Sequence, residues 1–388
     1  MKGVPRTVWA LGAVSLCMDL SSEMVHGLLP LFLTGVLGAS MLAVGVIEGI
    51  AEATASVVKV FSGALSDRFA RRKPLVVAGY ALAALSKPLF PLASSVPLVL
   101  FARFADRIGK GIRGAPRDAL IADVTPPELR GTAYGLRQAL DTVGAVLGPL
   151  AAVGLMLLYA DDIRRVLWVA VVPALAAVAV LVVFVREPPR DRAPGARPNP
   201  LTRAALGALG RRYWAIVALG AVLTLARFSE AFLVLRAQEL GIALALIPLV
   251  LVVMNVVYTA ISYPAGVAAD SGHRRALLVW GLAALIGADV LIAATASVAA
   301  LIGGIVLWGA HMGLTQGLLS TLVADAAPAE LRGTAFGVFH LVSGVALLAA
   351  SVLAGWLWSV YGAGATFYTG AAFCAAALAG LLIALRPE

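Results

Sequence analysis

The sequence predicts an all-α membrane protein in which twelve transmembrane helices form two six-helix repeats. Three observations support this fold class. Hydrophobic residues make up 61% of the 388 positions and charged residues only 13%, about half the usual share of a water-soluble domain. Apolar runs long enough to cross a ~30 Å hydrocarbon core as a helix recur from end to end. Two polar sequence patterns also occur twice, at nearly the same spacing.

The apolar runs define the expected helices and domains. The candidate spans cover residues 7–33, 41–64, 74–94, 97–117, 131–159, 164–185, 212–236, 242–268, 274–293, 297–323, 332–359 and 362–385. The first run is long and lacks a small-residue cleavage site, so we expect it to be retained as a helix. A segment rich in proline and arginine follows the sixth span and predicts a linker. We therefore expect a six-helix bundle over residues 1–186, a cytoplasmic linker over 187–211 and a second six-helix bundle over 212–388.

The repeats lie in polar segments between the expected helices. ADVTPPELRGTAYG, which begins at Ala122, matches ADAAPAELRGTAFG, which begins at Ala324, at ten of fourteen positions and an offset of 202. A glycine, an aspartate and two arginines that begin at Gly63 recur from Gly266, at an offset of 203. Because polar loops do not resemble one another merely by being apolar, these matches indicate a duplicated unit. Parallel repeats of this kind are an architecture of secondary transporters.

The basic residues predict how the helices are oriented. With both termini and the linker in the cytoplasm, the cytoplasmic segments hold most of the 30 lysine and arginine residues, as the positive-inside rule requires. The net charge of +9 therefore reflects membrane topology, and we expect no nucleic-acid partner. Both cysteines, Cys17 and Cys374, lie in apolar runs, which argues against a disulfide framework or a thiolate metal cluster.

Three motifs resemble those of the major facilitator superfamily. They are GALSDRFARRK at residues 63–73, RIGKG at 107–111 and GAVLGP at 144–149. The resemblance covers the whole chain and implies two six-helix bundles that carry a solute by alternating access. The third motif resembles one that is associated with exporters, with Ala151 and Ala152 in place of its trailing glycine pair.

Two further segments are similar to a bacterial subgroup of this superfamily. DLSSEM at residues 19–24 and DRIGKGIR at 106–113 resemble proteins described as nickel or cobalt efflux permeases. Such permeases often end in a histidine-rich tail, whereas this chain ends in LRPE. The resemblance therefore implies export from a bacterial cell without naming the solute. It also implies a multi-pass protein of the inner membrane, for which we expect both termini to be cytoplasmic.

Acidic residues inside the first two spans are the candidates for proton coupling. An ionisable group near the centre of a bilayer costs ~2.5 kcal/mol or more, which makes each one a functional hypothesis. Asp19 and Glu23 lie one turn apart on one helix face, and the sequence offers no basic residue within a turn of them. Two carboxylates this close repel each other in a low dielectric, so we expect one of them to take up and release a proton. Glu52 is the second candidate.

Other intramembrane residues are candidates for binding the solute. Arg103 and Arg107 are the deeper members of a basic row in the fourth span, and they could bind an anionic group or hold the acids of the first two helices. Arg137 and Asp141, four residues apart, either contact the solute or only neutralise each other. The full candidate set is Arg103, Arg107, Arg137, Asp141, Asn255 and Gln316. Structural roles are expected for the histidines His311 and His340, for a local pair of Arg227 with Glu230, and for Trp356 and Trp358 as interfacial anchors.

A group of charges at the cytoplasmic ends of the helices predicts a latch. It comprises Asp67, Arg68, Arg71, Arg72, Asp118 and Asp123. By the family likeness, Asp67 should lie near a helix N-terminus, where exposed amide groups favour a negative charge. One arginine of the cluster should pair with an acid at the end of the fourth helix, with Asp118 as the expected partner. Such a pair would stabilise the outward-open state.

The function expected from these features is proton-coupled export of a small solute. The expected partners are the solute, protons and the lipid bilayer, the protein is expected to act as a monomer, and no cofactor or resident metal is expected. Efflux of a divalent metal or a metal chelate is the alternative, based on the acids with His26 in the first span and on the subgroup likeness. A membrane enzyme or receptor is the alternative from another class, but the sequence contains no HExxH, GxSxG or phosphate-binding glycine loop.

Overall fold

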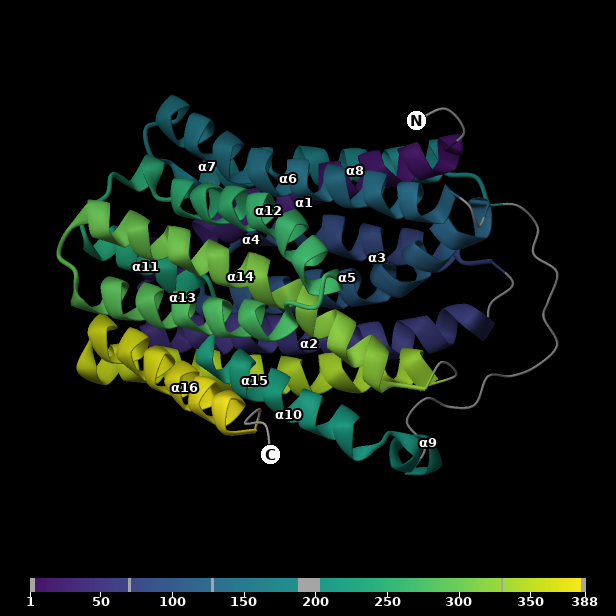
Figure 1. Cartoon of the computed structure of the whole chain (residues 1–388). Coiled ribbons are helices and arrows are strands. Elements are labelled where there is room, and N and C mark those ends of the chain that lie inside the picture. Colours follow the sequence, from purple (N-terminus) through teal and green to yellow (C-terminus); the bar gives the residue numbers. More distant parts are fainter. Residues whose placement is uncertain (1–3, 69–70, 127–128, 188–202, 329–330, 385–388) are drawn as a thin grey trace. The chain divides into compact units, whose positions relative to one another are not determined.

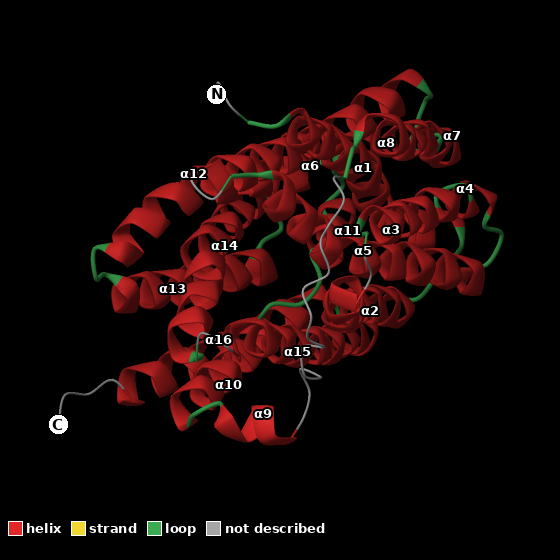
Figure 2. Ribbon diagram, turned by 90° about the vertical axis from the view of Figure 1, so that its right-hand side faces the viewer, coloured by secondary structure: helices red, strands yellow, loops and turns green. Residues whose placement is uncertain are grey.

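The computed structural model describes residues 4–68, 71–126, 129–187, 203–328 and 331–384, and these residues form helices without any strand (Figure 2). Ten helical segments in this part of the chain are long and apolar enough to cross a membrane. Two more complete the set: α5 (Val96–Val124), which carries many charged side chains, and the shorter apolar part of α16 (Ala363–Ala384). The twelve-helix fold is therefore confirmed, and most helix ends lie within a few residues of the expected limits, with the end of α5 as the main exception.

The chain divides into two compact units. The first comprises Met1–Phe32 and Thr54–Asn199, and the second comprises Leu33–Ala53 and Pro200–Glu388. Residues 33–53, which the sequence assigns to the first bundle, thus group with the second unit. The limits of the two expected bundles and of the linker otherwise remain predictions.

The first unit contains α1 and α3 to α8, which are coloured purple to teal in Figure 1. Helix α1 packs along α6 and α8, and α3 packs along α5 and α8. The helices of this unit are α1 (Arg6–Leu31), the second part of α2 (Met41–Arg68), α3 (Lys73–Ser86), α4 (Leu89–Leu92), α5, α6 (Arg130–Leu158), α7 (Ile163–Val169) and α8 (Val171–Phe184). Tyr80, Met18 and Leu120 lie in its buried apolar core.

The second unit repeats this arrangement. Here α10 packs along α15 and α16, and α13 packs along α14 and α16. Its elements are most of the π-helix η1 (Phe32–Val36), the first part of α2, α9 (Arg203–Ala208), α10 (Arg211–Ala226), α11 (Ala231–Glu239), the 3-10 helix η3 (Leu244–Leu246), α12 (Leu249–Asp270), α13 (Arg274–Ala294), α14 (Val298–Ala326), α15 (Arg332–Tyr361) and α16.

The duplication is visible in individual helix contacts. A Cβ added to Gly111 of α5 would lie 2.6 Å from Val58 Cβ and 3.0 Å from Ala55 O, both on α2. A Cβ added to Gly313 of α14 would lie 2.8 Å from Ile261 Cβ and 3.0 Å from Tyr258 O, both on α12. Gly111 and Gly313 are 202 positions apart, and the residues of α2 and α12 that they contact are 203 positions apart. These are the same two offsets that relate the repeated polar segments. Each unit therefore uses the same glycine to bring the same two helices together.

Alanine at Gly111 is expected to destabilise the protein by about 1–3 kcal/mol, because the added methyl group overlaps helix α2. The matched control is Gly154→Ala, since a Cβ at Gly154 would meet no atom within 4 Å. Thermal unfolding of the purified variants in detergent measures the difference. Equal melting temperatures for the two variants would contradict the close packing described for Gly111.

Three of the spans are interrupted. The third breaks between α3 and α4 at Lys87 and Pro88, and the sixth breaks at Ala170, shortly before the proline of α8. The seventh unwinds from Arg227 to Glu230 without any proline. Its freed amides find other acceptors: Ser229 N donates to Ser351 Oγ at 3.3 Å, and Ala231 N donates to Ser229 Oγ at 3.3 Å. Unwound backbone of this kind is stable inside a membrane only when it is enclosed by protein or lines a cavity.

Candidate functional site

Asp19 and Glu23 lie at a close contact between α1 and α6. A Cβ added to Gly144 would be 3.0 Å from Asp19 Cβ, and one added to Gly148 would be 2.7 Å from Glu23 Cβ. These glycines, four residues apart, are the two of the GAVLGP motif, and small residues at that spacing let helix backbones approach closely in membranes. The motif therefore presses α6 onto the face of α1 that carries both acids, each of which is half-buried.

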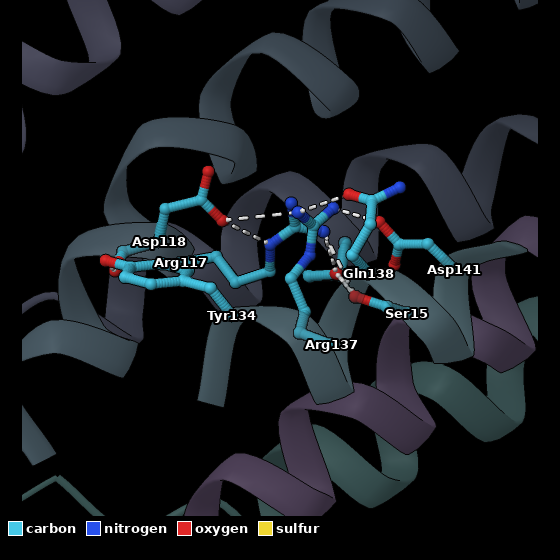
Figure 3. Close-up of polar contacts among 8 residues, drawn as sticks. Ser15, Arg117, Asp118, Tyr134, Arg137, Gln138 and Asp141 are labelled. Atoms are coloured by element: carbon cyan, nitrogen blue, oxygen red, sulfur yellow. Dashed lines mark hydrogen bonds and ion pairs between the residues drawn. The ribbon is translucent and has the colours of Figure 1, made fainter. Parts of the chain in front are cut away.

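A polar network continues from this contact along α6 (Figure 3). Arg137 forms an ion pair with Asp141 one turn later, and its Nη1 atom lies 4.0 Å from Asp118 Oδ1 on α5. Asp118 also pairs with Arg117, with Nε 3.1 Å from Oδ1. Asp19 is close enough to Asp141 for the two charges to repel. Three acids and two arginines thus share one stretch of the first unit.

Arg117 joins this network to α1 and α3. Its Nη1 atom donates to Ser15 Oγ at 3.0 Å and to Tyr80 OH at 3.3 Å. The hydroxyl of Tyr134 donates to Asp118 O at 2.7 Å, which fixes α6 to α5. Each of these side chains is therefore held by partners from another helix, so a change in charge at one of them acts on several helices.

A second charged cluster lies deeper in α5. Lys87 Nζ and Asp106 Oδ1 form an ion pair at 2.9 Å, with side chains only 1% and 4% exposed. Lys87 also donates to Ser22 Oγ at 3.0 Å, and Arg107 Nε lies 3.6 Å from Asp106 Oδ2. Arg103 Nη2 lies 3.1 Å from His26 Nδ1 on α1. These contacts bring the candidate residues Arg103 and Arg107 together with side chains of α1 and α3.

The remaining basic residues of α5 have different surroundings. The predicted row comprises Arg103, Arg107, Lys110, Arg113 and Arg117. The four arginines are buried, and Lys110 is exposed. The guanidinium of Arg113 lies 4.4 Å from the centre of the Tyr80 ring, a cation–π contact. The arginines of this row therefore do not share one environment, because each contacts different residues of α1, α3 or α5.

The ion pair at the start of α3 differs from the expected latch in its acid. Arg72 Nε lies 2.9 Å from Asp123 Oδ2, whereas the expected partner, Asp118, lies between Arg117 and Arg137. Both acids belong to the last turns of α5, which extends seven residues beyond the predicted end at 117. Arg71 is exposed. The side chains of Asp67 and Arg68 lie outside the described residues.

A different carboxylate occupies the N-terminus of α3. Glu187 Oε1 accepts from Arg72 N at 2.6 Å, and Glu187 Oε2 accepts from Lys73 N at 2.9 Å. The first amides of a helix lack partners within it, and a carboxylate there is favoured by both hydrogen bonding and the helix dipole. The sequence assigns Glu187 to the linker. Its position three residues after the end of α8 gives no signal in the sequence that it caps a distant helix.

Comparison with known proteins assigns the family. The profile of the Major Facilitator Superfamily matches residues 11–235 and 224–388, which together cover nearly the whole chain. The chain belongs to the Major Facilitator Superfamily. It is therefore a multi-pass membrane transporter.

Known transporters resemble this chain in sequence or in fold. An uncharacterised MFS-type transporter of Methanocaldococcus jannaschii is 32% identical over 363 residues, 92% of this chain and 89% of the relative. The multidrug resistance protein MdtH of Proteus mirabilis is 33% identical over 133 residues, which cover 34% of this chain and 32% of MdtH. The crystal structure of the nucleoside transporter NupG superposes with a TM-score of 0.79 over 98% of this chain and 100% of NupG, at 11% identity. That likeness shows the fold alone.

The remaining candidate residues for proton coupling and solute binding in this Major Facilitator Superfamily protein lie in the second unit. Glu52 belongs to the part of α2 that groups with that unit, and Asn255 on α12 and Gln316 on α14 are half-buried there. Arg103, Arg107, Arg137 and Asp141 belong to the first unit, where Arg137 pairs with Asp141 while Arg103 and Arg107 lie in the second charged cluster. His311 has the structural role expected of it, because its Nδ1 donates to Gly281 O at 2.8 Å.

One prediction for the second unit is wrong, namely that Trp358 is an interfacial anchor. Trp358 is only 6% exposed and packs against Phe232 and Phe367, because the unwound segment places an aromatic cluster beside it. It is therefore a core residue, whereas Trp356 is 44% exposed. Arg227 and Glu230 lie in the break between α10 and α11, and a local pair between them stays a prediction.

Proposed function

We propose that this transporter exports a small solute in exchange for protons, by alternating access. The observation that supports proton coupling is the position of Asp19 and Glu23 against the two glycines of α6, beside Asp141. Binding a proton there would relieve the repulsion between neighbouring acids. The network around Arg137 would then carry one negative charge fewer, and the packing of α1 against α6 would change with it. Glu52 is the second candidate for carrying the proton.

Two observations favour export. The GAVLGP motif resembles one associated with exporters, and both of its glycines are used to pack α6 against α1. The partial match to a multidrug resistance protein adds support, although it covers about a third of each chain.

The proposed solute contacts in the first unit favour a negatively charged group. Three cations, Lys87, Arg107 and Arg103, act electrostatically on the single carboxylate of Asp106. An anionic group near Arg103 and Arg107 would be held by charge-assisted hydrogen bonds. Arg137 and Asp141 could exchange their mutual pairing for contacts with the solute, and Asn255 and Gln316 are the proposed contacts from the second unit.

Efflux of a divalent metal or a metal chelate is the second candidate. It is favoured by the likeness of residues 19–24 and 106–113 to nickel and cobalt permeases. Among the described residues, no group of three or more His, Cys, Asp or Glu side chains could hold a metal ion.

The direct test begins with thermal-shift screening of the purified protein against organic anions, organic cations, divalent metals and metal chelates. Solutes that raise the melting temperature are then assayed in proteoliposomes with an imposed pH gradient. Proton-coupled export predicts solute movement against proton flow, and its loss when a protonophore collapses the gradient. Transport that is unaffected by the gradient would contradict proton coupling. Stabilisation by metals alone would favour the second candidate.

We also propose that Arg72 and Asp123 form a cytoplasmic latch for the outward-open state. A partly exposed pair is worth about 1 kcal/mol, which is enough to shift a balanced two-state equilibrium roughly fivefold. Asp123→Asn should therefore increase the cytoplasmic-open population. The measurement is the distance distribution between spin labels at Leu65 on α2 and Gly337 on α15.

The matched control for the latch is Arg165→Gln, which breaks an exposed pair with Asp162 and should leave the distribution unchanged. If Asp123→Asn leaves the distance distribution unchanged while transport is lost, the pair acts in folding or insertion and the latch is wrong.

A further inference from the structure

Asp289 on α13 is a buried acid that the proposed mechanism does not use. Its side chain is fully buried, with 0% of its surface exposed. Neither of its carboxylate oxygens has a hydrogen-bond partner among the described residues. A buried polar group without a partner is rare in folded proteins and calls for a functional explanation.

The carboxylate lies beside the unwound segment of the seventh span. A Cβ added to Gly370 of α16 would be 2.6 Å from Asp289 Oδ2, 3.1 Å from Phe228 Cε1 and 3.2 Å from Ala226 O. Asp289, Phe228 and the last carbonyl of α10 therefore surround the same point. The final carbonyls of a helix have no partner within it, so Ala226 O is an acceptor without an intrahelical donor.

The neighbouring titratable and charged groups do not neutralise Asp289. Cys374, one turn after Gly370 on α16, directs its thiol to Leu282 O at 3.4 Å. The Nδ1 of His311 on α14 donates a hydrogen bond to Gly281 O, and the positive charge of Arg227 interacts with the His311 imidazole. Arg236 of α11 donates to Ile292 O and Thr295 O at the end of α13. The part of α12 from 249 to 269 contains no Asp, Glu, Lys or Arg, only Tyr258 and Tyr263.

The internal repeat explains why this acid has no counter-charge. At the offset of 202 that relates Gly111 to Gly313, Asp289 corresponds to Lys87 and Trp308 corresponds to Asp106. In the first unit these positions form the buried ion pair of Lys87 with Asp106. In the second unit these two positions hold an acid and a tryptophan instead, and the Nε1 of Trp308 is likewise buried without a partner in the described part of the chain. The second unit thus keeps the buried charged position but has lost the ion pair.

An ionised carboxylate in this setting would carry a large desolvation cost that neither a counter-charge nor a hydrogen bond offsets. The neutral acid avoids that cost and can donate a hydrogen bond to a carbonyl such as Ala226 O. In transporters with broken helices, the carbonyls of the unwound backbone and of the C-terminal helix end take part in binding protons or sodium. We propose that Asp289 is a proton-binding site of the second unit, in which the neutral acid stabilises the junction between α10 and α11.

Release of this proton would place a negative charge against the carbonyl end of α10 and loosen the unwound segment. Protonation itself is independent of the function proposed above, whereas its use in the transport cycle rests on that function.

The test is infrared difference spectroscopy of the purified protein, comparing the wild type with Asp289→Asn at neutral pH in sodium-free buffer. The carbonyl stretch of a protonated carboxylic acid is separate from the bands of a carboxylate. We expect one protonated-acid band in the wild type to be lost in Asp289→Asn. Asp162→Asn, at the exposed N-cap of α7, is the control and should lose no such band.

Each outcome of this experiment decides the proposal. An unchanged protonated-acid region in Asp289→Asn would overturn it, and disappearance of the wild-type band on adding sodium at constant pH would assign the site to sodium instead. Because Asn has the shape of the neutral acid, a variant that fails to fold would also contradict the proposal. The band does not depend on transport, so it should persist in Asp19→Asn and Glu23→Gln even if proton-coupled export proves wrong.

Discussion

Replacing Asp19 by Asn or Glu23 by Gln is expected to abolish transport driven by a pH gradient while solute counterflow continues. Both substitutions keep the side-chain volume at the contact with Gly144 and Gly148, so α1 and α6 should still pack together. Neither new side chain can release a proton. Counterflow needs only reorientation of the loaded carrier, so it separates loss of coupling from loss of solute binding.

The assay compares gradient-driven transport and counterflow in the same proteoliposomes. Asp161→Asn, at an exposed turn after α6, is the control and should retain both activities. Full gradient-driven transport in both variants would remove the coupling role from Asp19 and Glu23. Glu52→Gln would then be the next variant to test.

Removal of Lys87 is expected to have the largest effect on stability. Lys87→Met leaves Asp106 buried without its 2.9 Å partner and should cost about 3–5 kcal/mol. The double variant with Lys87→Met and Asp106→Leu removes both charges of this pair and should recover part of this loss. Recovery is incomplete because Arg107, whose Nε lies 3.6 Å from Asp106 Oδ2, then loses that carboxylate. Unfolding of the purified variants by denaturant measures the free-energy differences, and the four proteins form a double-mutant cycle.

The comparison for this cycle is an exposed ion pair. Arg165→Gln breaks a pair whose side chains are 68% and 40% exposed, and it should change stability by less than about 1 kcal/mol. A double variant as unstable as Lys87→Met alone would contradict the assignment of this cost to the unpaired carboxylate of Asp106.

Sequence periodicity predicts the helices well because membrane spans are long and apolar. The ends of α1, α6 and α13 fall close to the predicted limits. The break at Arg227 could not be predicted, since it contains no proline and depends on Ser351 of a distant helix. An apolar run looks the same whether its helix is continuous or broken.

The sequence predicts the partners of charged side chains less well than it predicts the helices. Spacing along one helix correctly pairs Arg137 with Asp141, because both lie on the same helix. It cannot show that Lys87 reaches Asp106, that Arg72 reaches Asp123 or that Glu187 caps α3, because these contacts depend on how helices pack. The same limit applies to Asp289, whose lack of a partner follows from its three-dimensional surroundings.

The division of α2 has a practical consequence for dissecting the protein. Residues 33–53 group with the second unit, and a Cβ added to Gly49 would lie 3.0 Å from Leu348 Cα of α15. An N-terminal fragment that ends at the proline-rich segment would therefore contain the first half of α2 without α15. The residues that bury this half of α2 would belong to the other fragment. Co-expressed fragments should reassemble more readily than either fragment folds alone. A better place to divide the gene for complementation is the turn before α2, which leaves that helix with the residues that bury it.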